Sequence, residues 1–251
     1  MTVIKIECSN CTPDREYVVE ELATAEIAIE MHFDEIISTQ SRAARRIELV
    51  QGIRNELSKF KWLISGSVQI ELAWYLHSVE RQDTDKVGDI DNITKPILDS
   101  LIGPQGVLID DSQIGSIHTF WLSRNDQLSY NVLRLQVQFS NDDCLSKEQL
   151  KFIRYWDAMC IAINSDFSSL KSVFGACVVV LARRRHRRTA KLMKALGAHA
   201  DQYLITSTWD FHRTRLNSFP PETILTVPQL LQRAAAVGLT RRTAPRLKKQ
   251  A

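Results

Sequence analysis

Long apolar runs are missing from this sequence. The longest candidate, around Val178–Ala182, is far shorter than the ~20 residues that span a bilayer, and it runs directly into the basic stretch RRRHRR. The first ten residues, MTVIKIECSN, lack a basic segment followed by an apolar one, so we expect no secretory signal. These two absences exclude a membrane-inserted or secreted class and predict a cytoplasmic protein.

Paired metal-binding motifs are missing as well. Cys8 and Cys11 form one C-x-x-C pair among five cysteines, but no second pair follows at a matching spacing, and the nearest histidine, His32, stands alone. A structural zinc site needs four ligands, usually as two such pairs. We therefore expect reduced thiols, with a zinc site as the less favoured alternative. Internal repeats and low-complexity tracts are also missing.

The charge is unevenly divided. The 251 residues carry a formal net charge of +3, but residues 1–143 hold 13 Lys+Arg against 23 Asp+Glu, whereas residues 144–251 hold 19 against 6. Such asymmetry indicates a polyanionic partner bound by the basic part. A solvated basic surface is the alternative. The length suits one large domain or two small ones.

Hydrophobic periodicity predicts a mixed first part. Apolar and polar residues alternate in TVIKIEC at the start and in residues 67–79, 113–124 and 129–140, which favours four strands. Residues 13–37 and 41–60 are predicted as helices, the first with Thr12 as its cap and Pro13 in its first turn, and the second with a stripe formed by Ala44, Ile47, Val50, Ile53, Leu57 and Phe60. We expect an α+β domain over residues 1–143, with a small mixed sheet and packed helices, and a basic, mostly helical DNA-binding or accessory region over residues 144–251.

The stretch GDIDNITKPILDSLIGPQGVLIDDSQI, residues 88–114, gathers carboxylates among Ile and Leu residues. Clustered carboxylates repel one another unless a cation lies between them. An EF-hand calcium loop beginning at Asp83 would match at Asp85 and Gly88. It fails at Val87, where a ligand is needed, and at Thr94, where the closing glutamate is needed.

The spacing within this stretch indicates how the charges are arranged. A short helix is expected with its N-cap at one of residues 91–94, and the i, i+4, i+8 spacing places Asp91, Lys95 and Asp99 on one face. Asp89 points the same way as Asp91 if the segment before the helix is extended. GVLIDDSQI is predicted as a short buried strand ending in two acids, Asp110 and Asp111. These groups can converge on one point, and Mg²⁺ prefers such oxygen ligands. Two interpretations stay open: a phosphoryl-transfer metal site, or a helix-capping acid among ordinary surface acids.

The same residues resemble a known pattern. The motif D-x-D-N, with a Lys four residues after the second Asp, another Asp four residues further on, and a later D-D-x-Q, is similar to that of the RusA family of Holliday junction resolvases, the crossover junction endodeoxyribonucleases. The residues that match are Asp89, Asp91, Asn92, Lys95, Asp99, Asp110, Asp111 and Gln113. The resemblance covers residues 65–140 well and residues 1–64 loosely; it does not extend over residues 145–251.

The resemblance implies a small α+β endonuclease that acts as a homodimer on four-way DNA junctions with Mg²⁺, with Mn²⁺ as a substitute, and without a small-molecule cofactor. Asp89, Asp91 and Asp111 would be the metal ligands, and Lys95 would assist at the scissile phosphate. In this mechanism a metal-activated water attacks phosphorus in line. The remaining motif residues are expected to orient the ligands or Lys95: Asn92, Asp99, Asp110 and Gln113.

The basic part holds two candidate DNA-binding segments. The first contains Arg183, Arg184, Arg185, Arg187 and Arg188; phosphate contacts by even half of its cations would dominate affinity, and a solvated basic helix is the alternative. The second, LLQRAAAVGLTRRTAPRLKK, resembles a helix-turn-helix with Gly238 at the turn; its outward cations would be Arg241, Arg242, Arg246 and Lys248. Pro245 would break the second helix, so an ordinary helix pair with a basic tail is the alternative.

We therefore predict a Mg²⁺-dependent endodeoxyribonuclease that cleaves four-way or related branched DNA. Two other functions remain open: a non-cleaving, structure-specific DNA-binding protein, and a nuclease for other branched or invading DNA.

Overall fold

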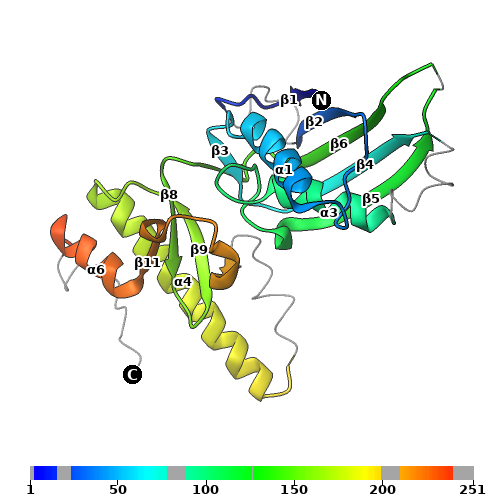
Figure 1. Ribbon diagram of the computed structural model, residues 1–251. Coiled ribbons are helices and arrows are strands. Elements are labelled where there is room, and N and C mark those ends of the chain that lie inside the picture. The colour runs from blue at the N-terminus through cyan, green and yellow to red at the C-terminus, as the bar shows by residue number, and fades with distance from the viewer. Residues whose placement is uncertain (1–2, 16–23, 78–88, 126, 199–209, 240–251) are drawn as a thin grey trace. The chain divides into compact units, whose positions relative to one another are not determined.

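A computed structural model describes residues 3–15, 24–77, 89–125, 127–198 and 210–239. The chain divides into two compact units, Met1–Cys144 and Leu145–Ala251, whose elements are labelled in Figure 1. The α+β class predicted from the sequence is confirmed, since unit 1 packs helices on a mixed sheet.

Unit 1 is built on a five-stranded sheet with the order β1-β2-β6-β4-β5. Neighbouring strands are antiparallel except β4 and β5, which run parallel. A parallel pair requires a crossover connection, and the segment that contains helix α3 supplies it. The strands are β1 (Val3–Ser9), β2 (Thr24–Phe33), β4 (Val68–Leu76), β5 (Ile114–Ser123) and β6 (Asn131–Ser140). Strands β1, β4, β5 and β6 confirm the four that alternation predicted.

Strand β2 corrects the helix predicted over residues 13–37. Its side chains alternate strictly: Ala25, Ile27, Ile29, Met31 and Phe33 are buried, while the residues between them are partly exposed. This period of two suits a half-buried strand, and pairing with β1 and β6 on either side satisfies its backbone. Thr12 does cap a turn, because its hydroxyl accepts from the Arg15 amide at 3.1 Å, but no helix runs on into residues 24–33.

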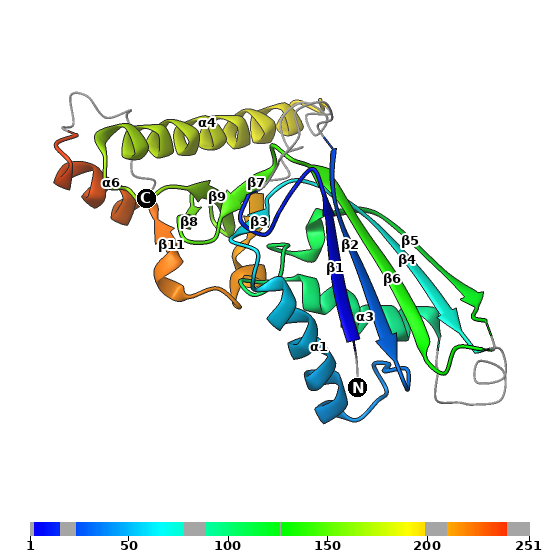
Figure 2. The ribbon, with the colours of Figure 1, turned by 90° about the horizontal axis from the view of Figure 1, so that it is seen from above.

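Helices α1 (Ala43–Leu57) and α3 (Ile90–Leu101) cover one face of the sheet, as Figure 2 shows. The hydrophobic core lies between these helices and the sheet and includes fully buried side chains such as Trp74 and Ile53. Burying a large apolar side chain of this kind stabilises the fold by about 1.5–3 kcal/mol. The predicted stripe on α1 is wrong in part, because Ile47 is 67% exposed. The buried positions are Leu49, Ile53 and Leu57, and Ile47 lies about 200° around the helix from Leu49 at roughly 100° per residue.

The strand predicted to end at Asp110 and Asp111 does not form. Its middle residue, Leu108, makes only isolated bridges with Ile64 and Ile102. Residues 106–110 are nevertheless buried, and they lead into a single 3₁₀ turn, η1 (Asp111–Gln113), just before β5. Ile64 belongs to the short strand β3 (Trp62–Ile64).

Unit 2 has its own sheet and core. The sheet order is β10-β9-β8-β11, in which β11 runs parallel to β8 and the other pairs are antiparallel. The long helix α4 and the shorter α6 pack on it around residues such as Ile153, Val180 and Leu230. A four-stranded sheet was not anticipated for this helix-rich region. The elements are β7 (Cys144–Ser146), which crosses the boundary between the units, β8 (Leu150–Arg154), β9 (Met159–Asn164), α4 (Leu170–Ala195), β10 (Asp210–His212), η2 (Arg213–Leu216), η3 (Pro221–Thr223), β11 (Ile224–Thr226) and α6 (Val227–Ala236).

Candidate active site

The acidic motif begins at the start of α3. Asp89 is the N-cap residue, with φ −78° and ψ 159°, and Asp91 lies in the first turn; both are exposed. The sequence predicted a cap at one of residues 91–94, so the helix begins at least two residues earlier than expected. Carboxylates are favoured at this end because the helix dipole places partial positive charge there. Both acids are therefore held at an exposed edge at little electrostatic cost.

Because α3 starts early, Pro96 lies inside the helix. This proline affects the hydrogen bonding of Asn92, one turn before it. Proline has no N–H, so the carbonyl four residues before it, that of Asn92, loses its helical partner. The amide of Thr39 donates to this carbonyl at 2.9 Å, and the Thr39 hydroxyl donates to the Asn92 Oδ1 at 2.6 Å. The pair ties the start of α3 to the loop before α1, which supports the expected positioning role of Asn92.

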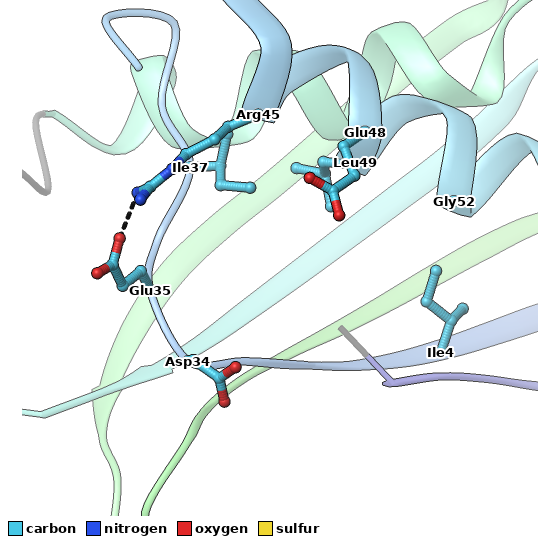
Figure 3. A pocket seen from close by; sticks show the side chains of 8 residues that line it. All are labelled: Ile4, Asp34, Glu35, Ile37, Arg45, Glu48, Leu49 and Gly52. Atoms are coloured by element: carbon cyan, nitrogen blue, oxygen red, sulfur yellow. Dashed lines mark hydrogen bonds and ion pairs between the residues drawn. The ribbon is translucent and has the colours of Figure 1, made fainter. Parts of the chain in front are cut away.

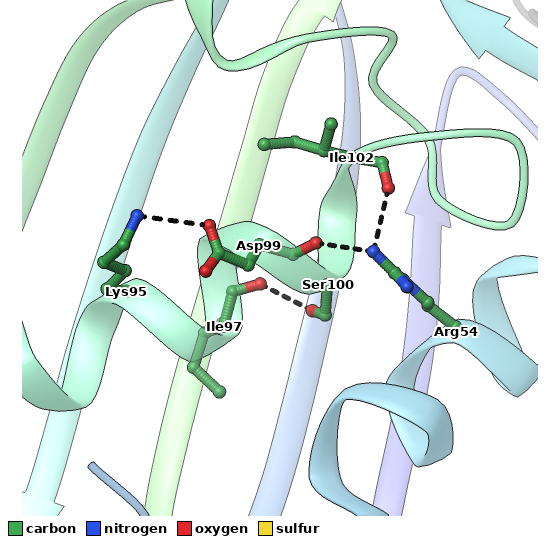
Figure 4. Close-up of polar contacts among 6 residues, drawn as sticks. All are labelled: Arg54, Lys95, Ile97, Asp99, Ser100 and Ile102. Carbon is green, nitrogen blue, oxygen red and sulfur yellow. Dashed lines mark hydrogen bonds and ion pairs between the residues drawn. The ribbon is translucent and has the colours of Figure 1, made fainter. Parts of the chain in front are cut away.

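Lys95 and Asp99 follow on an exposed face of α3. The Lys95 Nζ lies 3.4 Å from the Asp99 Oδ1, and the two side chains are 66% and 53% exposed (Figure 4). An exposed pair of this kind contributes well under 1 kcal/mol to stability, so separating Lys95 from Asp99 costs little. The Arg54 guanidinium donates to the carbonyls of Asp99 and Ile102, at 3.0 and 3.3 Å, and fixes the last turn of α3 against α1.

A tight turn after α3 returns the chain to the end of the helix. The amides of Val107 and Leu108 both donate to the carbonyl of Leu101, at 2.9 Å. Gly106 makes this approach possible, because a Cβ atom there would lie 2.0 Å from the same carbonyl oxygen. The residues that follow therefore start from the C-terminal end of α3.

Gln113 holds the second acidic pair in place. It is 2% exposed, and its Oε1 accepts from the amides of Ile109 and Asp110, at 2.7 and 3.0 Å. Its Nε2 donates to the carbonyls of Ile64 and Gly66, at 2.7 and 3.0 Å. All four hydrogen-bonding positions of the amide are used, so this glutamine joins the acidic turn to the entrance of β4.

The two acids of the D-D pair have different surroundings. Asp110 is 4% exposed, and its Oδ2 accepts from the Ser112 hydroxyl at 2.7 Å. Asp111 is exposed on η1. The outward acid is thus the one predicted as a metal ligand, and the inward acid is the one predicted to support it.

Within the described residues, these carboxylates do not form one cluster in a single chain. Asp89 and Asp91 lie at the N-terminal end of α3, whereas the turn leading to Asp111 is anchored at its C-terminal end. The twelve residues of α3 rise by about 1.5 Å from each to the next, which separates the first and the last by roughly 17 Å. Mg²⁺ needs its ligands at about 2.1 Å. Within the described ranges, no three His, Cys, Asp or Glu side chains are grouped closely enough to hold a metal ion.

A cavity of about 490 Å³ lies between β1, the segment after β2, and α1 (Figure 3). Ile4 and Leu49 supply apolar lining, and Arg45 pairs with Glu35 beside it. None of the motif residues lines it. Asp89, Asp91, Asp99 and Asp111 instead lie on exposed surface, which suits a substrate as large as nucleic acid better than a small molecule.

The cysteine pair is made of free thiols: Cys8 is exposed and Cys11 is buried. A hydrogen bond between the two lowers the pKa of Cys8 and raises that of Cys11. The Cys11 thiol also contacts the carbonyl of Glu26, at 3.5 Å. Reduced thiols, expected from the sequence, are what the structure holds at this position.

The arginine run on α4 is divided between two environments. Arg183 and Arg187 approach Asp210, at 3.9 and 3.7 Å, and Asp210 also accepts from the Tyr155 hydroxyl at 2.8 Å. Burial first, and then the charge of Asp210, raise the pKa of Tyr155 to about 12. Two of the arginines predicted to bind DNA therefore take part in an internal ion-pair network.

Within the described residues, the other arginines of the run form no such ion pair with a carboxylate. Arg184 is half-buried, and Arg185 and Arg188 are exposed. In the second predicted segment, α6 ends at Ala236, Gly238 follows it with φ +83°, and the Leu239 amide donates to the Ala234 carbonyl at 2.9 Å. The predicted outward cations Arg241, Arg242, Arg246 and Lys248 lie outside the described residues, as does the helix expected to carry them.

Sequence comparison agrees with the geometry of unit 1. Residues 37–137 match the family described as endodeoxyribonuclease RusA. This segment contains every acidic motif residue and Lys95, and also Thr39, which the motif did not reveal. No curated protein matches the chain. In the part of the chain that the structure describes, no helix combines the length and apolar character needed to span a bilayer.

Proposed function

We propose that this chain, whose residues 37–137 form an endodeoxyribonuclease domain of the RusA family, cleaves four-way or related branched DNA by hydrolysis of a phosphodiester. The observation that carries the proposal is the family match over the segment holding the acidic motif. The exposed position of Asp89, Asp91 and Asp111 supports it, because a strand of DNA could reach all three.

The separation of the acids along α3 leads us to propose a site shared between two copies of the chain. Asp89 and Asp91 of one copy would be completed by Asp111 of the other, and a two-fold axis would generate two identical sites. Paired sites suit a substrate that must be cut symmetrically on two strands. The length of α3, roughly 17 Å at about 1.5 Å per residue, supports this arrangement, because Asp89 and Asp91 lie at one end of the helix and the turn that leads to Asp111 is anchored at the other.

The donor set fits a hard divalent cation in kind, since all three candidate ligands are carboxylates. We assign Asp89, Asp91 and Asp111 to hold Mg²⁺ or Mn²⁺, which when bound would activate water and neutralise phosphate charge. Lys95, one turn beyond Asp91, would release Asp99 and contact a phosphate oxygen. Asp110 would keep the turn that carries Asp111 in position through its bond with Ser112.

The first experiment incubates the full chain with labelled four-way, forked and linear DNA, with and without Mg²⁺. Cleavage of the branched substrates alone, dependent on the metal, is expected. Binding without cleavage of any substrate would refute the enzymatic function and leave a structure-specific DNA-binding protein.

The second experiment mixes two inactive variants, Asp91→Asn and Asp111→Asn. In a shared site, the mixed dimer contains one site with all its acids intact. At equal amounts about half of the dimers are mixed, so cleavage should recover to about a quarter of the wild-type level. Mn²⁺ binding, followed by electron paramagnetic resonance, should recover in parallel. If both signals stay absent after the subunits have exchanged, each site lies within one chain and the shared arrangement is refuted.

A further inference from the structure

Unit 2 contains a basic pocket that the endonuclease motif does not explain. It lies beside the end of β8, the middle of α4 and the start of α6, and has a volume of about 270 Å³. Its lining includes Arg154, Trp156, Arg184 and Thr226, and one carboxylate, that of Asp157. None of these residues falls in the matched segment 37–137.

Arg184 carries a charge that its surroundings do not neutralise. Its Nε is buried and has no hydrogen-bond partner among the described residues. Burial first, and then the nearby charge of Arg188, lower the pKa of Arg184. Arg183 and Arg187, on the neighbouring face of the same helix, instead approach Asp210. One face of α4 is therefore internally compensated, and the face that lines the pocket is not.

Further positive charge surrounds the pocket. Arg188 and Lys191 follow Arg184 at i+4 and i+7, so the three share one face of α4. The Lys191 Nζ lies 4.9 Å from the centre of the Trp156 ring, which places this cation beside the pocket lining. The N-terminus of α6 begins after Thr226 and adds the partial positive charge of a ten-residue helix. Asp157 opposes these groups, but it is exposed.

Leaving a buried guanidinium donor without an acceptor costs free energy, and a bound anion would remove that cost. Guanidinium groups match the paired oxygens of a phosphate better than a single carbonyl. We propose that this pocket binds a backbone phosphate of a DNA strand, with Arg184 and Arg154 as its principal contacts. It is a second DNA contact outside the nuclease domain, and it divides the arginine run into binding residues and structural ones.

The test measures binding of fluorescein-labelled duplex and single-stranded DNA to the full chain by anisotropy, in EDTA so that no cleavage occurs. Arg184→Gln and Arg154→Gln should each weaken binding about 10-fold at 150 mM salt and make the log K against log[salt] slope shallower by about one. Arg185→Gln, one residue along α4 and fully exposed, removes the same charge and is the matched control. It should change the affinity less than about 3-fold, since its phosphate contact is not preformed.

Equal weakening by Arg184→Gln and Arg185→Gln would show a diffuse charge effect and overturn the pocket. A third arm titrates inorganic phosphate and pyrophosphate. If Arg184→Gln weakens the binding of these anions but leaves the affinity for DNA unchanged, the pocket binds a small anion and the proposal is also overturned. The binding assay needs no cleavage. If the pocket does not bind DNA, the proposed endonuclease activity is unaffected, and if the chain does not cleave DNA, the binding result can still be interpreted.

Discussion

Replacing Gln113 by alanine should destabilise unit 1 more than any substitution of the exposed motif acids. The change leaves two amides and two carbonyls without their partners, at 2.7–3.0 Å in the native chain. Ile64 and Ile109 are fully buried, so water cannot replace the lost bonds. Each orphaned group costs about 1–3 kcal/mol, although relaxation recovers part of this, and we expect a total loss of about 4 kcal/mol.

Urea unfolding followed by circular dichroism checks this estimate. With a slope of about 2 kcal/mol per molar urea, a loss of 4 kcal/mol lowers the midpoint of unit 1 by about 2 M. Ser112→Ala is the matched control, because it removes one hydrogen bond from the same turn and should cost about 1 kcal/mol. A loss below 1 kcal/mol for Gln113→Ala would refute the idea that this side chain fastens the acidic turn.

Gln113→Glu separates the contribution of the two hydrogen bonds that the side chain accepts from that of the two that it donates. The introduced carboxyl group can still accept from Ile109 and Asp110, but it places an oxygen against the carbonyls of Ile64 and Gly66. Its folded-state pKa should rise above the ordinary value near 4.3, because only the protonated form can donate to a carbonyl. Stability should therefore improve as the pH falls through that raised pKa, relative to the alanine variant measured in parallel.

Three further substitutions test other parts of the structure. Lys95→Ala should lower the rate of cleavage far more than the affinity for DNA; a parallel drop in both would make Lys95 only a phosphate contact. Glu30→Gln removes a carboxyl whose pKa is lowered from 4.5, first by His32 and then by Arg134. The wild type should therefore lose its stability advantage as the pH falls below 4.5 and through the lowered pKa, and a difference in melting temperature that does not change with pH would contradict this. Asp210→Asn should destabilise unit 2 by about 3 kcal/mol, measured by urea unfolding; an unchanged midpoint would show that the network around it contributes nothing.

In the sheet of unit 1, strands β4, β5 and β6 were predictable because apolar and polar residues alternate along them. Strand β2 was missed although its alternation is equally strict. Thr12, Pro13 and the acids that follow imitate a helix start, and local capping signals outweighed the period of two. Local sequence signals predict the secondary structure of a segment poorly when strand pairing on both sides of it determines whether it forms a strand.

The motif residues could be selected from the sequence, and their role in a site stays a prediction, but their arrangement in space could not be predicted. Fixed spacings identified every acid, yet the early start of α3 depends on a contact with Thr39, 53 residues earlier in the chain. Likewise, the five arginines of RRRHRR form one basic segment in the sequence. Only Asp210, which lies on β10, distinguishes Arg183 and Arg187 from Arg184. Long-range partners of this kind leave no local signal in the sequence.

The length of α3 has a consequence for when the enzyme can act. If the acids at its two ends belong to different sites, a single chain cannot assemble either one, and activity follows the law of mass action. Below the dissociation constant of the dimer, the cleavage rate should fall with the square of the protein concentration. A newly made or dilute chain would then be harmless to the genome, and cutting would begin only where copies accumulate, such as two chains recruited to one junction.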